Sequence, residues 1–222
     1  MTVQRKVEAE WLDVDQGSER DVRQSLRDLQ RINTLFGGVS STVAMLRRVA
    51  NETHTRKLSL LEVASGAGFV PQRARVWLAG DVELEITLLD RAATHLPENG
   101  GQSYVGDALA LPFPENSFDV ISCGLFLHHL DPKEVLQFAR ESLRVARRAL
   151  VISDLIRSRL HLLLAHLSLP LYGSPITWHD SLASIRAAYT PPEVREMLRE
   201  CGARKVEIQR QYLYRMGVIV WK

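Results

Sequence analysis

The stretch Ser59-Leu-Leu-Glu62-Val-Ala-Ser-Gly66-Ala-Gly68-Phe-Val70 is an apolar run that breaks into small residues and then resumes with a helical pattern. Apolar residues on both faces are typical of a fully buried parallel strand. Gly66 and Gly68 allow backbone conformations and a close approach that a side chain would block. The stretch predicts a strand, a tight turn and a helix start, with a ligand at the carboxyl end of the strand, as in open α/β sheets.

The spacing of the glycines separates two kinds of ligand. A dinucleotide fingerprint has a further glycine three residues after the second one, and this chain has Pro71 there. Proline suits a first helical turn, but it donates no N–H to a phosphate. The carboxylate of Glu62, at the end of the strand, would repel a pyrophosphate and attract a cation. The loop therefore favours a ligand with an ammonium group and no phosphate.

The sequence from Glu62 to Gly68 resembles the acid-x-Gly-x-Gly-x-Gly signature of class I S-adenosylmethionine-dependent methyltransferases. Ala64 stands where that signature has its first glycine, a departure that resembles the methyltransferases of quinone biosynthesis. The resemblance implies that S-adenosylmethionine binds at this loop and leaves as S-adenosylhomocysteine.

Two aspartates follow the glycine loop. Residues 84–89 predict a second strand that ends at Asp90, whose carboxylate can accept hydrogen bonds from ribose hydroxyls; a helix cap is the alternative interpretation. The block from Tyr104 to Ser122 closely resembles the methyltransferase region in which Asp107 would receive the adenine amino group and the Ala108 N–H would meet the ring. The full set of cofactor residues that we expect is Glu62, Ala64, Ser65, Gly66, Gly68, Asp90, Arg91, Asp107, Ala108 and Gly124.

His128 and His129 are the candidate catalytic residues. They follow a fourth predicted strand, residues 118–123, and so reach the edge where a methyl group would be delivered. A neutral imidazole can take the proton of a phenol as its oxygen attacks a methyl group. Packing or substrate contact is the alternative role for this pair. The sequence has no cluster with the spacing of a metal site, so we expect no metal.

Later residues bear on the acceptor. Residues 155–172 are rich in leucine and predict a helix that covers the active site or packs in the core. An apolar cover would favour a lipophilic or aromatic acceptor. His179, Asp180, Arg186 and Tyr189 are candidate substrate contacts, and a solvated loop before a helix is the alternative.

Length and composition suit one α/β domain that binds a small molecule. The chain has 222 residues and a net charge of +2, which calls for no nucleic-acid partner. Its two isolated cysteines and its charged first residues predict a cytoplasmic protein, and the leucine-rich run carries too many charges for a membrane helix. Amphipathic patterns over residues 18–34 and 39–49 predict two helices. The resemblance implies that residues 1–54, which include these helices, form a lid.

These observations lead to one expected architecture and one expected reaction. By resemblance, residues 55–222 form a Rossmann-like, seven-stranded α/β sheet with helices on both faces, and its last strand runs antiparallel between its neighbours. The expected reaction is methyl transfer to a hydroxyl of a small aromatic or polyketide-type acceptor by a monomer or homodimer. The alternatives are carbon methylation of a quinone precursor, a nicotinamide-dependent reductase and a non-catalytic cofactor-binding protein.

Overall fold

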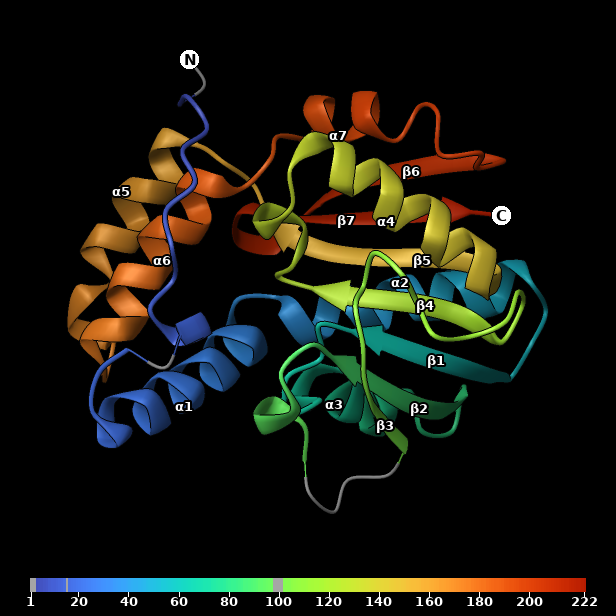
Figure 1. The fold of residues 1–222 in the computed structure, drawn as a ribbon, viewed down its shortest axis with the longest axis horizontal. Coiled ribbons are helices and arrows are strands. Elements are labelled where there is room, and N and C mark those ends of the chain that lie inside the picture. Colours follow the sequence, from blue (N-terminus) through green and yellow to red (C-terminus); the bar gives the residue numbers. More distant parts are fainter. Residues whose placement is uncertain (1–2, 15, 98–101) are drawn as a thin grey trace.

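A seven-stranded sheet forms the centre of the computed structural model, which describes residues 3–14, 16–97 and 102–222 (Figure 1). The strand order is β3-β2-β1-β4-β5-β7-β6. Neighbouring strands from β3 to β5 pair parallel, and β7 is antiparallel to both β5 and β6. This confirms the predicted sheet, including the last strand between its neighbours. The strands are β1 (Lys57–Val63), β2 (Glu83–Asp90), β3 (Gln102–Val105), β4 (Phe118–Gly124), β5 (Ala146–Leu155), β6 (Lys205–Gln211) and β7 (Arg215–Trp221).

Helices cover both faces of the sheet and one of its edges. The helices α4 (Pro132–Val145) and α7 (Pro191–Met197) lie on one face, and α2 (Gly38–Glu52) and α3 (Phe69–Leu78) on the other (Figure 1). The remaining helices, α1 (Glu19–Leu35), α5 (Arg159–Leu167) and α6 (Pro175–Ala187), lie beyond the carboxyl ends of the parallel strands. Of the predicted N-terminal helices, α1 therefore lies at the edge and α2 packs beneath the sheet. Short 3-10 turns are η1 (Leu12–Val14), η2 (Ala93–His95), η3 (Leu127–His129), η4 (Leu169–Leu171) and η5 (Tyr212–Tyr214).

The core has two layers, one on each face of the sheet. Leu61 and Ile121 pack with Phe138 of α4, while Leu60 packs with Leu46 and other residues of α2 and α3. Leu60 and Leu61 are adjacent and both fully buried, because successive side chains of a strand point to opposite faces. The apolar run that opened the sequence is thus the central buried strand that its pattern predicted.

The turn after β1 needs glycine at one position for two reasons. Gly68 has a φ of +71°, and a Cβ atom there would lie 2.7 Å from Cδ1 of Leu88. A side chain would therefore be strained by the backbone and would force the Leu88 side chain of β2 to move. Ala64 also has a positive φ, of +51°, at the position where we noted the missing first glycine. Helix α3 starts at Phe69, directly after this turn.

Several predicted boundaries are wrong. The helix expected over residues 155–172 is broken into α5 and η4; Ser158 caps the start of α5, and the helix ends before Ser168. His179 and its neighbours lie in α6, which Ser174 and Pro175 begin, so the solvated-loop alternative is wrong for them. Arg147 and Arg148 lie in β5, which begins at Ala146 directly after the end of α4.

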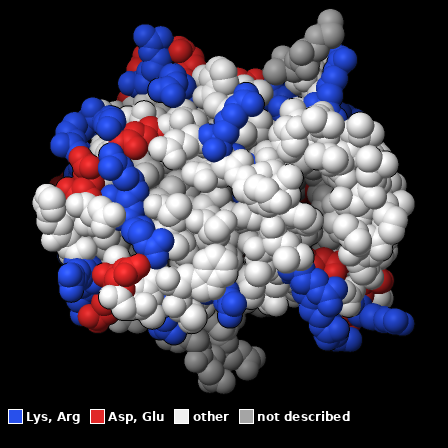
Figure 2. Space-filling model, turned by 180° about the vertical axis from the view of Figure 1, so that it is seen from behind, with Lys and Arg blue, Asp and Glu red and all other residues white. Residues whose placement is uncertain are grey.

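The leucines of α5 and η4 face outward to a large extent. Leu163, Leu167 and Leu171 expose 53%, 67% and 71% of their surface. The lobe of the molecule that carries these elements, on the right in Figure 2, shows a broad uncharged surface. Helix α5 therefore does not bury its leucines over the sheet edge, as a cover helix would. Within the described residues, no helix has the length and apolar character needed to cross a membrane.

Candidate functional site

Loops at the carboxyl ends of the first four strands bring the predicted cofactor residues to one edge of the sheet. Asp90, at the end of β2, accepts a hydrogen bond from the Gly66 N–H at 2.8 Å and one from the Ala92 N–H at 3.0 Å. The first bond fastens the glycine turn to the neighbouring strand. The second is a local bond of the kind that a helix-cap role for Asp90 predicts. The carboxylate therefore takes part in the glycine turn and in a local cap.

Glu62 is buried at the end of β1, with 4% of its surface exposed. Burial raises the pKa of its carboxyl to about 7, although the hydrogen bond from the Ser122 hydroxyl of β4 acts in the opposite direction. Burial disfavours the charged form of an acid, and a nearby cation favours it. A ligand with an ammonium group at this edge would therefore lower the pKa of Glu62 and gain a counter-ion.

The remaining predicted cofactor residues lie in the same row of loops. Asp107, after β3, is exposed and accepts a hydrogen bond from the Leu109 N–H at 2.9 Å. Ala108 beside it is 8% exposed. Arg91 is exposed, Gly124 ends β4 half-buried, and Ser65 donates its N–H to the Leu89 carbonyl oxygen at 3.1 Å. The edge thus presents carboxylates after β1, β2 and β3.

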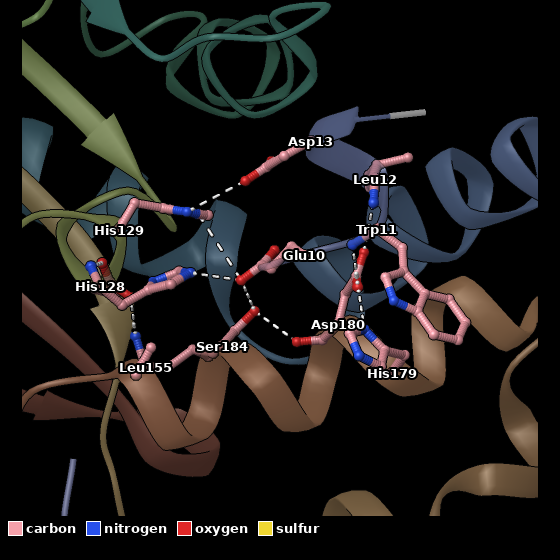
Figure 3. A network of polar contacts seen from close by, with 12 residues as sticks. Glu10, Trp11, Leu12, Asp13, His128, His129, Leu155, His179, Asp180 and Ser184 are labelled. Atoms are coloured by element: carbon pink, nitrogen blue, oxygen red, sulfur yellow. Dashed lines mark hydrogen bonds and ion pairs between the residues drawn. The ribbon is translucent and has the colours of Figure 1, made fainter. Parts of the chain in front are cut away.

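His128 lies in η3, where the chain leaves β4, and it contacts two carboxylates. Its Nδ1 is 2.7 Å from Oδ1 of Asp154, which lies near the end of β5. Its Nε2 is 3.3 Å from Oε1 of Glu10 in the N-terminal segment (Figure 3). Both His128 and Asp154 are almost fully buried, at 2% and 1% exposed.

The charge of His128 follows from these contacts. Burial alone would lower the pKa of its imidazole, but the carboxylates of Asp154 and Glu10 raise it to about 10. Burial would raise the pKa of Asp154, and the positive imidazole lowers it below the ordinary value. In this arrangement the imidazole is therefore protonated on both nitrogens and positively charged at neutral pH. This argues against the predicted general-base role of His128, since neither ring nitrogen is free to accept a proton.

His129 has a different environment although it is the next residue. Its Nδ1 lies 3.4 Å from Oδ2 of Asp13, and its Nε2 lies 3.9 Å from Oε1 of Glu10. Its side chain is 31% exposed. Burial and the charge of His128 lower the pKa of its imidazole, which outweighs the opposite effect of the carboxylates. His129 is therefore the more easily deprotonated member of the pair.

The predicted substrate residues of α6 contact the N-terminal segment, which we define as residues 3–14. Asp180 accepts hydrogen bonds from the N–H groups of Trp11, at 2.8 Å, and Leu12, at 3.0 Å. The ring of His179 stacks on Trp11 with 4.0 Å between ring centroids. Arg186 also reaches this segment, since its guanidinium lies 3.3 Å from a carboxylate oxygen of Glu8.

Tyr189, the fourth predicted substrate residue, joins the same segment to η3. Its hydroxyl donates to the Leu130 carbonyl oxygen at 2.7 Å, and the guanidinium of Arg5 lies 4.2 Å from the centre of its ring. Arg5 also donates to the carbonyl oxygens of His128 and Leu130, both at 3.0 Å. All four residues therefore lie on one side of the edge, and their contacts here are within the protein.

Our reading of the sequence missed Glu10 and Asp13 at this site. Glu10 is held by the Ser184 hydroxyl of α6, which donates to its Oε1 at 2.5 Å. The segment around it is charged and has no helical or strand period, so no pattern indicated that it would dock. The position of Asp154 could have been recognised from the sequence, because an acid at the carboxyl end of a parallel strand lies at the ligand-binding edge.

Comparison with known proteins relates part of this chain to methyltransferases. Residues 61–150 match the model of a family described as a methyltransferase domain. A search of curated proteins finds no match in sequence. Many solved structures resemble the fold, all of those cited next with low sequence identity.

Three of these structures illustrate the likeness. The plantazolicin methyltransferase BpumL, in complex with a monoazolic desmethylPZN analogue and SAH, has a TM-score of 0.69 at 13% identity, over 96% of this chain and 92% of that one. Human N-acetylserotonin methyltransferase, in complex with SAM, gives 0.63 at 14% identity, over 97% and 59%. A SAM-dependent methyltransferase from Aquifex aeolicus gives 0.53 at 18% identity, over 79% and 88%.

The two histidines should differ in their effect on stability. Replacing His128 by Gln leaves the buried Asp154 and Glu10 carboxylates without their cation, and we expect the free energy of unfolding to fall by about 3–5 kcal/mol. Replacing the partly exposed His129 by Gln should change it by about 1 kcal/mol or less. Urea denaturation of both variants at pH 7.5 measures the difference. Equal losses would contradict the buried ion pair.

Proposed function

We propose that this chain, a class I methyltransferase that uses S-adenosylmethionine, methylates a hydroxyl of a small, lipophilic, aromatic or polyketide-type acceptor. The observation that carries the proposal is the match of residues 61–150 to a methyltransferase domain. The acceptor and its oxygen are the part that we add.

The charges at the sheet edge support the binding of this cofactor. When bound, S-adenosylmethionine supplies an electrophilic methyl group on a sulfonium. Glu62 fits its ammonium group, because a buried acid with a pKa of about 7 gains a counter-ion when a cation enters. Asp90, which already holds the glycine turn, is placed at the strand end where an acid accepts ribose hydroxyls.

The N-terminal segment and α6 are the parts of the chain that we assign to the acceptor. The N-terminal segment meets η3 beyond the end of β4 through the contact of Arg5 with the His128 carbonyl oxygen. Glu10 lies between His128 and Ser184 of α6 (Figure 3). We propose that the segment and α6 hold the acceptor near the methyl group and exclude water, since orientation in a closed site supplies much of the rate of such a displacement. Among proteins of similar fold, one is human N-acetylserotonin methyltransferase, and another is the CMeT domain of the citrinin polyketide synthase. These names support a small aromatic or polyketide-type acceptor.

The test of the function is a direct one. We expect the purified chain to bind S-adenosylmethionine or S-adenosylhomocysteine in calorimetric titration, and NAD not to compete. A panel of phenols and polyketide-type aromatics, incubated with isotopically labelled methyl donor, should then yield labelled methyl ethers that mass spectrometry identifies. Binding of NAD with none of S-adenosylmethionine would overturn the assignment, and labelled carbon would overturn the choice of oxygen.

Cofactor affinity should depend on pH through Glu62. An acid with a raised pKa is ionised above about 7 and neutral below it, so an ammonium ligand should lose its partner as the pH falls. We expect the affinity of the wild type for S-adenosylmethionine to rise about fivefold between pH 6 and pH 7.5, because the ionised fraction of Glu62 increases over this range. Glu62→Gln should be nearly flat over this range. If the affinity depends on pH equally in both proteins, Glu62 is not the partner of the ammonium group.

Asp90 should contribute to the same affinity by hydrogen bonding. Removing its carboxylate (Asp90→Ala) should weaken cofactor binding by about 1.5–3 kcal/mol, the range for hydrogen bonds to charged groups, which is about ten- to a hundredfold. Calorimetry measures the dissociation constant, and circular dichroism shows that the variant is folded. Asp107→Ala is a matched variant in the loop after the neighbouring strand β3, and a loss of affinity there as well would locate the adenine. An unchanged constant in folded Asp90→Ala would restrict Asp90 to its local cap.

A further inference from the structure

Three side chains from two distant parts of the sequence bring metal-binding atoms together at the end of β4. Oε1 of Glu10 lies 3.3 Å from Nε2 of His128 and 3.9 Å from Nε2 of His129. One ligand atom from each residue falls within 4.8 Å of the other two. Bonds of about 2.0–2.2 Å to a metal place neighbouring donors of a tetrahedral centre about 3.3–3.6 Å apart. Small movements of the partly exposed His129 would bring all three within that spacing.

Each imidazole of this cluster lies between two carboxylates, one of which is Glu10. Nδ1 of His128 contacts Asp154 at 2.7 Å, and Nδ1 of His129 contacts Asp13 at 3.4 Å. Both Nε2 atoms then lie toward Glu10 (Figure 3). A carboxylate on one ring nitrogen fixes the tautomer and leaves the other nitrogen for a metal, the arrangement that metal-binding histidines commonly have.

The neighbours of the cluster hold it in place. Asp154 also accepts hydrogen bonds from the N–H groups of His128, at 3.3 Å, and Leu155, at 2.6 Å, so its carboxylate is fixed on both oxygens. The Ser184 hydroxyl donates to the same oxygen of Glu10 that the imidazoles approach. The cluster therefore has outer contacts for a carboxylate ligand as well as for a histidine ligand.

The charges in the cluster call for a cation. With Nδ1–H of His128 donated to Asp154, its Nε2 lies against a carboxylate oxygen of Glu10, and without a metal the second proton of the charged imidazole lies between these two atoms. A metal ion bound to Nε2 would take the place of this proton and release it. A proton on Nε2 meets the need for a cation at one imidazole. Here two imidazole nitrogens approach one oxygen, with the carboxylates of Asp13 and Asp154 behind them. A single metal ion satisfies both nitrogens and the oxygen together.

We propose that Glu10, His128 and His129 bind one divalent first-row transition metal ion, such as Zn²⁺ or Co²⁺. Two imidazoles and one carboxylate are the ligands that such ions prefer, whereas Mg²⁺ and Ca²⁺ prefer oxygen ligands. Three protein ligands leave at least one position open for water or another oxygen ligand. The ion would also tie the N-terminal segment to the end of β4. This inference concerns binding and stands apart from the choice of acceptor.

The experiment uses the full chain without an affinity tag, treated with chelator, dialysed and titrated with Co²⁺ and Zn²⁺ at pH 7.5. We expect one equivalent of Zn²⁺ to bind, with a dissociation constant in the micromolar range or below, and bound Co²⁺ to develop visible absorption. Glu10→Gln and His129→Ala should each weaken binding at least tenfold. The control is His166→Ala, since His166 is an exposed histidine of α5 outside the cluster, and it should bind metal as the wild type does.

Two results would overturn the proposal. One is the absence of saturable binding of either ion up to about a hundredfold excess, and the other is equal binding by the wild type and by both cluster variants. In either case, the cluster would be an ion-pair network that fastens the N-terminal segment. Circular dichroism of each variant shows that it is folded, which we expect because Glu10 lies outside the sheet and His129 is partly exposed.

Discussion

The contact between His128 and Asp154, both buried, is the interaction on which the edge of the sheet depends. It joins the end of β4 to the end of β5 at 2.7 Å and fixes the position of η3. Arg5 then donates to the carbonyl oxygens of His128 in η3 and of Leu130 directly after it, and Glu10 approaches the far side of the imidazole. Breaking one partner of such a pair leaves a buried charge without compensation, which costs far more than the loss of a surface ion pair.

The same edge treats its acids in two ways. Asp154 is paired with a cation and has a lowered pKa, while Glu62 is buried with a hydroxyl partner and has a pKa of about 7. The first acid belongs to the part of the edge that holds the N-terminal segment. The second belongs to the part beside the glycine turn, where it lies ready for a cationic ligand. The two ends of the edge are thus electrostatically distinct, although both are made from the ends of parallel strands.

The sheet could be predicted from the sequence, but the helices and the N-terminal segment beyond its edge only in part. Leu60 and Leu61, Gly68 and Asp90 lie in local patterns whose period and spacing determine a strand, a turn and a strand end, and the structure has these elements where we predicted them. Glu10 docks through contacts with residues more than a hundred positions away, and such contacts leave no period in the sequence. The break between α5 and η4 was missed for a different reason. The leucine-rich pattern continues across Ser158 and Ser168, the residues at which α5 starts and ends.

The docking of the N-terminal segment sets an order on protein synthesis. Trp11 leaves the ribosome long before its partner Asp180, which is 169 residues later in the chain. At about 5–20 residues per second, the segment waits roughly 10–30 s for α6 to be made. During that time β1, β2 and β4 can pair with one another, since they come from the first 124 residues. The first strands of the sheet are therefore built early and its edge is closed last, and a nascent chain that stops before α6 has its N-terminal segment undocked from Asp180.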